Sequence, residues 1–162
     1  MIIAIMGLTG SGKSTVAKII ASHLGAHLFD MDCEFSAEYV DRRKKNEVVP
    51  SADVKEYQRS MIERMLDLEN ESDVVMAGFF LDDELPKLLD ERTSVIWINL
   101  VTDDKGLLSE RIQKRKGHFP AALEVLEANW PHRSDQIVGK NIVDCSQPLD
   151  QVVNCCLSIS NV

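Results

Sequence analysis

The clearest chemical pattern in the sequence is its glycine-rich segment, Gly7-Leu8-Thr9-Gly10-Ser11-Gly12-Lys13-Ser14-Thr15. It fits the motif G-x-x-x-x-G-K-[ST], in which backbone N–H groups converge on phosphate oxygens and glycines permit the tight turn. We expect Lys13 to reach the β- and γ-phosphates of a nucleotide and the Ser14 hydroxyl to bind Mg²⁺. A plain glycine turn between a strand and a helix is the alternative, but the spacing and the Lys-Ser pair favour phosphate binding.

Two aspartates, Asp30 and Asp32, follow a short apolar run and flank Met31. Beside a phosphate loop, such a pair suggests one carboxylate that holds Mg²⁺ and one that orients or deprotonates an attacking hydroxyl. The alternative is that both only cap a helix and face solvent. The neighbouring phosphate motif favours the functional interpretation.

Two arginines, Arg111 and Arg115, are four residues apart in a helical pattern and therefore share one helix face. One guanidinium can stack on an adenine and the other can neutralise transferring phosphoryl oxygens, within a mobile lid that excludes water. A solvated helix face, shared with Lys114 and Lys116, is the alternative.

Weaker candidates for substrate contacts are Arg59 and Gly78. Arg59 could bind a substrate carboxylate while Glu63 holds it one turn later, although an ordinary surface ion pair fits the spacing equally. Gly78 ends an apolar run, and we expect it in a turn close to the phosphate loop.

Apolar runs and helical patterns alternate along the chain. The sequence predicts strands at residues 1–6, 26–29, 73–78, 94–100 and 141–144. It predicts helices at residues 16–24, 34–45, 53–69, 82–89, about 103–116, 121–128 and from 148 onward, with Asp53 and either Thr102 or Asp103 as caps. This alternation predicts an α/β fold in one domain, with a parallel sheet whose strands end at a common ligand cleft.

Composition narrows the classes of function. The net charge of −8 argues against a general binder of nucleic acid or anionic membranes. No apolar stretch is long enough to span a bilayer, and the N-terminal apolar run leads directly into the glycine loop, so we expect no signal peptide. The four cysteines have neither C-x-x-C nor metal spacing and predict free thiols in a reducing, cytoplasmic compartment.

Taken with these features, the chain resembles the small P-loop metabolite kinases, a group that includes gluconate kinase and shikimate kinase. The resemblance rests on Gly7–Thr15, on Asp30-Met31-Asp32, on residues 110–119 (ERIQKRKGHF) and on residues 143–153 (VDCSQPLDQVV). It implies a three-layer α/β/α P-loop fold with a five-stranded parallel sheet in the order 2-3-1-4-5. It also implies a helical lid at about residues 111–133.

The same resemblance implies roles for single residues. It assigns Mg²⁺ to Asp30, the acceptor hydroxyl to Asp32, the lid to Arg111 and Arg115, and the adenine to Gln147 and Pro148. The expected catalytic residues are Lys13, Asp32 and Arg115, with ATP and Mg²⁺ as cofactors.

The acceptor-side segments depart from the gluconate kinase pattern. Cys33-Glu34-Phe35-Ser36 stands where a His-Pro is usual, and Met76-Ala77-Gly78-Phe79-Phe80 carries no lysine. We predict an ATP-dependent kinase, a monomer or homodimer, that phosphorylates a hydroxyl of a small carboxylated metabolite, with gluconate as the first candidate. The alternatives are a shikimate-type or nucleoside monophosphate kinase, and a nucleotide-binding regulatory protein without turnover.

Overall fold

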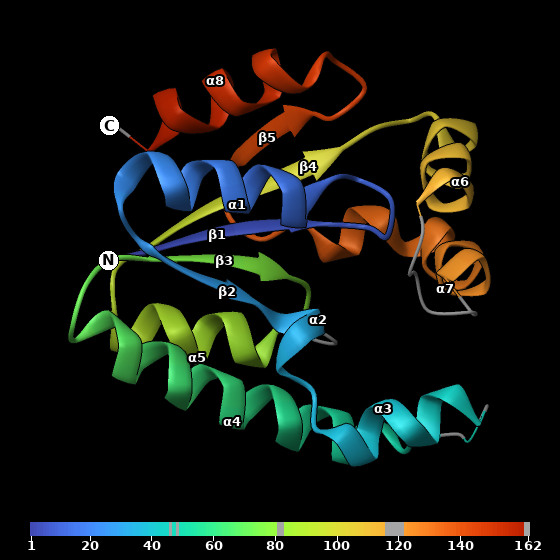
Figure 1. The fold of residues 1–162 in the computed structure, drawn as a ribbon, viewed down its shortest axis with the longest axis horizontal. Coiled ribbons are helices and arrows are strands. Elements are labelled where there is room, and N and C mark those ends of the chain that lie inside the picture. The colour runs from blue at the N-terminus through green and yellow to red at the C-terminus, as the bar shows by residue number, and fades with distance from the viewer. Residues whose placement is uncertain (46, 48, 81–82, 116–121, 161–162) are drawn as a thin grey trace.

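Five parallel strands in the order β2-β3-β1-β4-β5 form one sheet at the centre of the protein (Figure 1). The computed structural model describes residues 1–45, 47, 49–80, 83–115 and 122–160. The strands are β1 (Ile2–Gly7), β2 (His27–Asp30), β3 (Val74–Gly78), β4 (Val95–Val101) and β5 (Asn141–Asp144). The predicted α/β class and the predicted strand order are both confirmed.

Helices cover both faces of this sheet, as the three-layer prediction requires (Figure 1). On one face lie α1 (Lys13–Leu24) and α8 (Leu149–Ile159), and on the other lie α4 (Ser51–Glu69) and α5 (Glu84–Arg92). Beyond the carboxyl ends of the strands lie α2 (Met31–Glu34), α3 (Ala37–Lys44), α6 (Lys105–Lys114) and α7 (Ala122–Asn129). A 3₁₀ helix, η1 (Trp130–Gln136), leads from α7 toward β5. No helix in the described part of the chain has the length and apolarity needed to cross a membrane.

The side chains of β1 divide the core into two halves. Successive strand residues point to opposite faces, so Ile3 and Ile5 pack in one apolar cluster with Ile20 of α1. Ala4 packs in the second cluster with Met65 of α4. All five side chains are fully buried, which is why β1 is apolar throughout rather than alternating.

At two helix starts, those of α4 and α6, the residue that caps the helix differs from the prediction. The chain enters α4 through Pro50, and Asp53 lies in the first turn instead of capping it. At α6 the cap is Asp104, rather than Thr102 or Asp103, because the Asp104 Oδ1 accepts a hydrogen bond from the backbone N–H of Leu107 at 2.9 Å. Thr102 supports this turn by accepting from the Asp104 N–H at 3.1 Å.

The helix predicted for residues 34–45 begins only at Ala37, as α3, and a short helix that was not predicted, α2, precedes it. Phe35 ends α2 in an extended conformation, and the Ser36 Oγ accepts a hydrogen bond from the backbone N–H of Tyr39 at 3.1 Å. A serine that caps the next helix competes with helix continuation, so the chain turns there. The break lets α3 extend away from the end of β2 (Figure 1).

Candidate active site

A cavity of about 790 Å³ opens where the strands end. Its walls come from segments far apart in the sequence: the glycine loop, the residues after β2 and β3, the start of α4, the end of α6, α7 and the segment after β5. Twelve predicted site residues line it, namely Thr9, Gly10, Ser11, Gly12, Lys13, Ser14, Thr15, Asp30, Asp32, Arg111, Arg115 and Gln147. The fold therefore brings most of the predicted residues to one place.

The glycine loop that joins β1 to α1 depends on left-handed backbone at two positions. Gly10 and Gly12 have φ angles of 87° and 90°, a region that a side chain disfavours by roughly 1–2 kcal/mol. Gly10 also lacks room, since a Cβ there would lie 2.7 Å from the carbonyl oxygen of Leu108 in α6. The loop thereby aims the free N–H groups and positive dipole end of α1 at the cavity.

Two buried polar side chains of this loop suit an anion. Lys13 is 7% exposed, lines the cavity and forms no ion pair within the described residues. Ser11 is 3% exposed, and its Oγ has no hydrogen-bond partner in the described part of the chain. A buried ammonium and an unsatisfied hydroxyl are both costly alone. The loop thus holds donors that phosphate oxygens would satisfy.

The two aspartates reach the cavity through a helical turn. β2 ends at Asp30, whose Oδ1 accepts a hydrogen bond from the backbone N–H of Asp32 at 3.1 Å and so caps α2. Both carboxylates line the cavity, whereas the intervening Met31 is buried in the core. The capping alternative therefore holds for Asp30, but it coexists with a place in the site.

Ser14 and Asp30 are the residues that would hold Mg²⁺. Both offer oxygen ligands to the same cavity. Within the described residues, no group of three or more His, Cys, Asp or Glu side chains could hold a metal by itself. Mg²⁺ usually binds proteins through one or two side chains, with waters and substrate phosphates as its other ligands. The residues present fit an ion that arrives with a nucleotide.

The two arginines lie at the end of α6. The half-buried Arg111 guanidinium acts on Cys145, which follows β5: burial raises the pKa of the Cys145 thiol, and the Arg111 charge opposes that rise. Arg115 is exposed and acts on Cys33, next to Asp32: burial and the neighbouring carboxylates raise the pKa of the Cys33 thiol, and the Arg115 charge opposes that rise. Cationic and anionic side chains therefore approach one another across the phosphate end of the cavity.

A further part of the wall is what we term the acceptor end, which the sequence did not reveal. It consists of Phe35, Tyr39, Val49, Ser51, Val54, Gln58 and Phe79. Phe35 and Phe79 stand in the two segments that depart from the gluconate kinase pattern, and that departure was the one available signal. Their convergence requires the fold, because they are 44 positions apart in the sequence.

Two predicted substrate residues do not line this cavity. Arg59 is exposed, and its expected partner Glu63 pairs with Arg92 of α5 instead. Gly78 lies beneath Met31, where a Cβ would come within 2.4 Å of the Met31 Sδ. Gly78 therefore permits close packing of α2 on β3 and is not placed to contact a substrate.

Two predicted nucleotide residues lie at the margin. Pro148 occupies the position before α8 and does not line the cavity, although Gln147 and Leu149 on either side of it do. Gly7 lines a second cavity instead.

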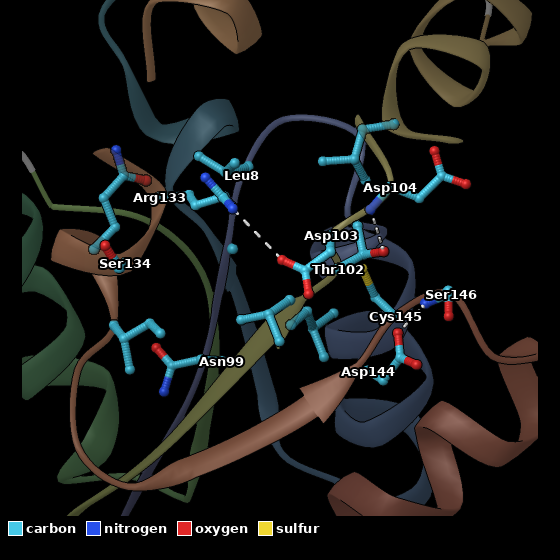
Figure 2. Close-up of a pocket in the computed structure, with 16 residues that line it drawn as sticks. Leu8, Asn99, Thr102, Asp103, Asp104, Arg133, Ser134, Asp144, Cys145 and Ser146 are labelled. Atoms are coloured by element: carbon cyan, nitrogen blue, oxygen red, sulfur yellow. Dashed lines mark hydrogen bonds and ion pairs between the residues drawn. The ribbon is translucent and has the colours of Figure 1, made fainter. Parts of the chain in front are cut away.

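This second cavity, of about 760 Å³, adjoins the first at Cys145, which lines both (Figure 2). Arg133 of η1 points toward Asp103 at 3.5 Å (Figure 2). The buried Asn99 makes three hydrogen bonds, donating to the carbonyls of Val138 and Asn141 and accepting from the Val138 N–H. These polar groups are paired with one another and hold the loops around the sheet edge.

The same loop after β5 carries Asp144, which accepts hydrogen bonds from the Ser146 N–H at 2.8 Å and from the Gln147 Nε2 at 3.2 Å. The Ser146 hydroxyl, the Ser146 N–H and the Gln147 amide lower the pKa of Asp144. They also fix Gln147 at the wall of the first cavity.

A family model described as AAA domain matches residues 3–129. The chain belongs to this family. The AAA-domain protein is 35% identical over 127 residues to "Probable gluconokinase" of Dictyostelium discoideum, a match that covers 74% of the chain and 63% of the relative. It is 32% identical over 102 residues to a shikimate kinase of Persephonella marina, covering 60% of each protein.

The chain thus spans about three fifths of the length of these curated relatives. Its fold is similar to that of a gluconokinase from Sinorhizobium meliloti, with a TM-score of 0.76 at 23% identity over 98% of the AAA-domain protein and 91% of that structure. At this identity the structural likeness concerns the fold, which is that of P-loop kinases.

Proposed function

We propose that the protein is an ATP-dependent kinase that transfers the γ-phosphoryl group to a hydroxyl of a small metabolite. One observation carries the proposal: a phosphate loop, a pair of carboxylates and two arginines line the same cavity. The similarity to gluconokinase and shikimate kinase supports it. Free cysteines at all four positions agree with the cytoplasm as its compartment.

The chain's own residues suffice to assign the steps. Asp32 orients the acceptor hydroxyl and takes its proton as the oxygen attacks the γ-phosphorus. The new O–P bond forms while the bond from the γ-phosphorus to the bridging oxygen breaks, and ADP leaves with that electron pair. Lys13 and Arg115 neutralise charge that develops on the phosphoryl oxygens. Mg²⁺, held by Ser14 and Asp30, would neutralise charge on the β- and γ-phosphates.

Nucleotide contacts follow from the same cavity. The guanidinium of Arg111 would stack on the adenine, and Gln147 would border it from the loop after β5. Arg111 and Cys145 of that loop line the same cavity, and the Arg111 charge acts on the Cys145 thiol, so the two walls of the adenine position lie close to each other. We also propose that the lid closes over this position. Residues 116–121 of the predicted lid lie outside the described residues.

The relatives' names make gluconate the first acceptor to test and shikimate the second. A coupled ADP-release assay with Mg·ATP should show stimulation by one acceptor in a panel of gluconate, shikimate, nucleosides and nucleoside monophosphates. The matched comparison is Lys13→Ala, which should bind acceptor but lose transfer. Tight ATP binding by the wild type without stimulation by any acceptor would instead favour a regulatory protein.

A further inference from the structure

The acceptor end differs in chemistry from the rest of the cavity. Its described lining residues are three aromatic side chains, two valines, one serine and one glutamine: Phe35, Tyr39, Phe79, Val49, Val54, Ser51 and Gln58. Within the described lining, the cationic side chains are Lys13, Arg111 and Arg115, all on the glycine loop or the end of α6. An acceptor that lies beyond Asp32 therefore meets rings, aliphatic groups and two uncharged polar side chains.

One aromatic wall is fixed by ring packing. The Phe35 and Tyr39 rings stack with 4.1 Å between centroids and 13° between planes. The Tyr57 ring of α4 meets them edge-on, at 6.4 Å from Phe35 and 5.3 Å from Tyr39. Such offset and edge-to-face contacts hold aromatic side chains in place beyond the effect of burial alone, so this wall keeps its shape without an acceptor.

The third ring is held by its backbone. Gln58 of α4 is 2% exposed, and its Nε2 donates to the carbonyl oxygen of Phe79 at 2.9 Å. This bond joins α4 to the residue that follows β3, and it leaves the half-buried Phe79 ring at the cavity wall. Two separate segments thus present aromatic surface to one space.

Among the described residues that line the acceptor end there is no cationic side chain, which argues against a carboxylate-bearing acceptor. Arg42 is engaged with Glu47 and Asp53, at 3.5 and 3.6 Å. Arg59 is exposed and outside the lining. Moving a carboxylate from water to an apolar wall without a paired cation is unfavourable. A flat uncharged ring, by contrast, gains stacking and burial there.

We infer that the acceptor of the proposed kinase carries its hydroxyl on a flat, uncharged ring body, of which a nucleoside is the common biological example. The inference rests on the proposed function and departs from the gluconate that the relatives' names suggest. The hydroxyl lies at Asp32 and the ring lies against Phe35, Tyr39 and Phe79. The step is the one given above, with the nucleoside oxygen forming the new O–P bond and its proton passing to Asp32.

The test compares acceptors and two neighbouring phenylalanines. ADP release with Mg·ATP is measured with adenosine, 2′-deoxyadenosine and thymidine against gluconate and shikimate at equal concentrations. The wild type should show kcat/KM for at least one nucleoside about tenfold or more above that for gluconate. Phe79→Leu removes the ring but keeps an apolar side chain, and it should raise the nucleoside KM about tenfold while kcat and the KM for ATP stay near wild type.

Phe80→Leu is the matched control, because Phe80 is buried and does not line the cavity. Its ring centroid lies 6.2 Å from that of Trp97. The substitution should lower the melting temperature but leave the nucleoside KM within about twofold. Gluconate turnover equal to or above that of every nucleoside would overturn the inference and keep the kinase. An unchanged nucleoside KM in Phe79→Leu would overturn it as well.

If the proposed kinase activity itself is wrong, the experiment gives a different result. If no acceptor stimulates ADP release, calorimetric titration of 2′-deoxyadenosine into the protein with a non-hydrolysable ATP analogue decides the matter. Binding that Phe79→Leu weakens and Phe80→Leu does not would support ring recognition at this end without transfer. Absence of binding would overturn both proposals.

Discussion

The phosphate end and the acceptor end of the main cavity use different physical means. The phosphate end consists of left-handed glycines, a buried lysine and a helix N-terminus within one continuous segment. The acceptor end is a largely aromatic and aliphatic surface assembled from α3, α4 and the residues that follow α2, α3 and β3. Charge and backbone direction define the first, whereas side-chain shape defines the second. Substitutions at the two ends should therefore fail in different ways.

The largest effect is expected at the phosphate end, from Lys13→Ala. Loss of a cation that neutralises the transferring phosphoryl group should lower kcat by roughly 10³-fold or more. Single-turnover ADP formation measures this loss. The melting temperature should change little, because Lys13 makes no ion pair in the described part of the chain. Transfer within about tenfold of the wild type would contradict the assigned role.

The next effect lies where the two ends meet, at Asp32. Asp32→Asn keeps the size of the side chain but cannot take the hydroxyl proton, so kcat should fall by roughly 10²- to 10³-fold with little change in the KM for ATP. Asp30→Asn is the matched variant, since asparagine can still cap α2. It should raise the Mg²⁺ concentration needed for half-maximal rate. A parallel loss of ATP affinity in Asp32→Asn would reassign this residue to the metal or nucleotide.

A smaller effect is expected within the glycine loop, where two substitutions separate the cost of backbone strain from the cost of a close contact. Gly12→Ala meets no atom within 4 Å and should cost only the left-handed strain, roughly 1–2 kcal/mol in the free energy of unfolding. Gly10→Ala adds a contact of 2.7 Å with the Leu108 carbonyl oxygen and should cost more. Urea unfolding of both variants measures the difference. Equal stability of the two would mean that α6 shifts freely away from the loop.

The contrast between the ends also explains what the sequence could predict. The glycine loop is local, so its spacing alone identified Lys13 and Ser14. Asp30 and Asp32 could be predicted because they lie at the end of a strand, and the carboxyl ends of parallel strands meet at one edge of the sheet. The acceptor end depends on how α3 and α4 pack, and no short sequence motif encodes that packing.

Two of the weaker predictions chose a residue one or two positions away from the residue that the structure uses. Gln58 faces the cavity and is 2% exposed, whereas the next residue, Arg59, is exposed. Adjacent residues on a helix differ by about 100° in direction, so Gln58 shares the buried face of α4 with Met61 and Met65, whereas Arg59 does not. At α6, Thr102, Asp103 and Asp104 can all cap a helix, and tertiary packing selected the last.

The smallest expected effect is at the adenine wall, through Gln147. Gln147→Ala removes one hydrogen bond to the Asp144 carboxylate at an exposed position, so ATP should bind roughly threefold more weakly. The control is Gln151→Ala, an exposed residue of α8 outside the cavity lining, which should leave ATP binding unchanged.

A second readout is the titration of Asp144 by NMR. Hydrogen bonds from Ser146 and Gln147 lower the pKa of Asp144 in the folded protein. Its contribution to stability is therefore present above the pKa of the unfolded chain and is lost as pH falls through the lowered folded pKa. Gln147→Ala should raise this pKa toward the ordinary value, and part of the shift should remain because the Ser146 N–H still donates. An unchanged pKa together with weaker ATP binding would mean that Gln147 acts on the nucleotide directly, without holding the loop.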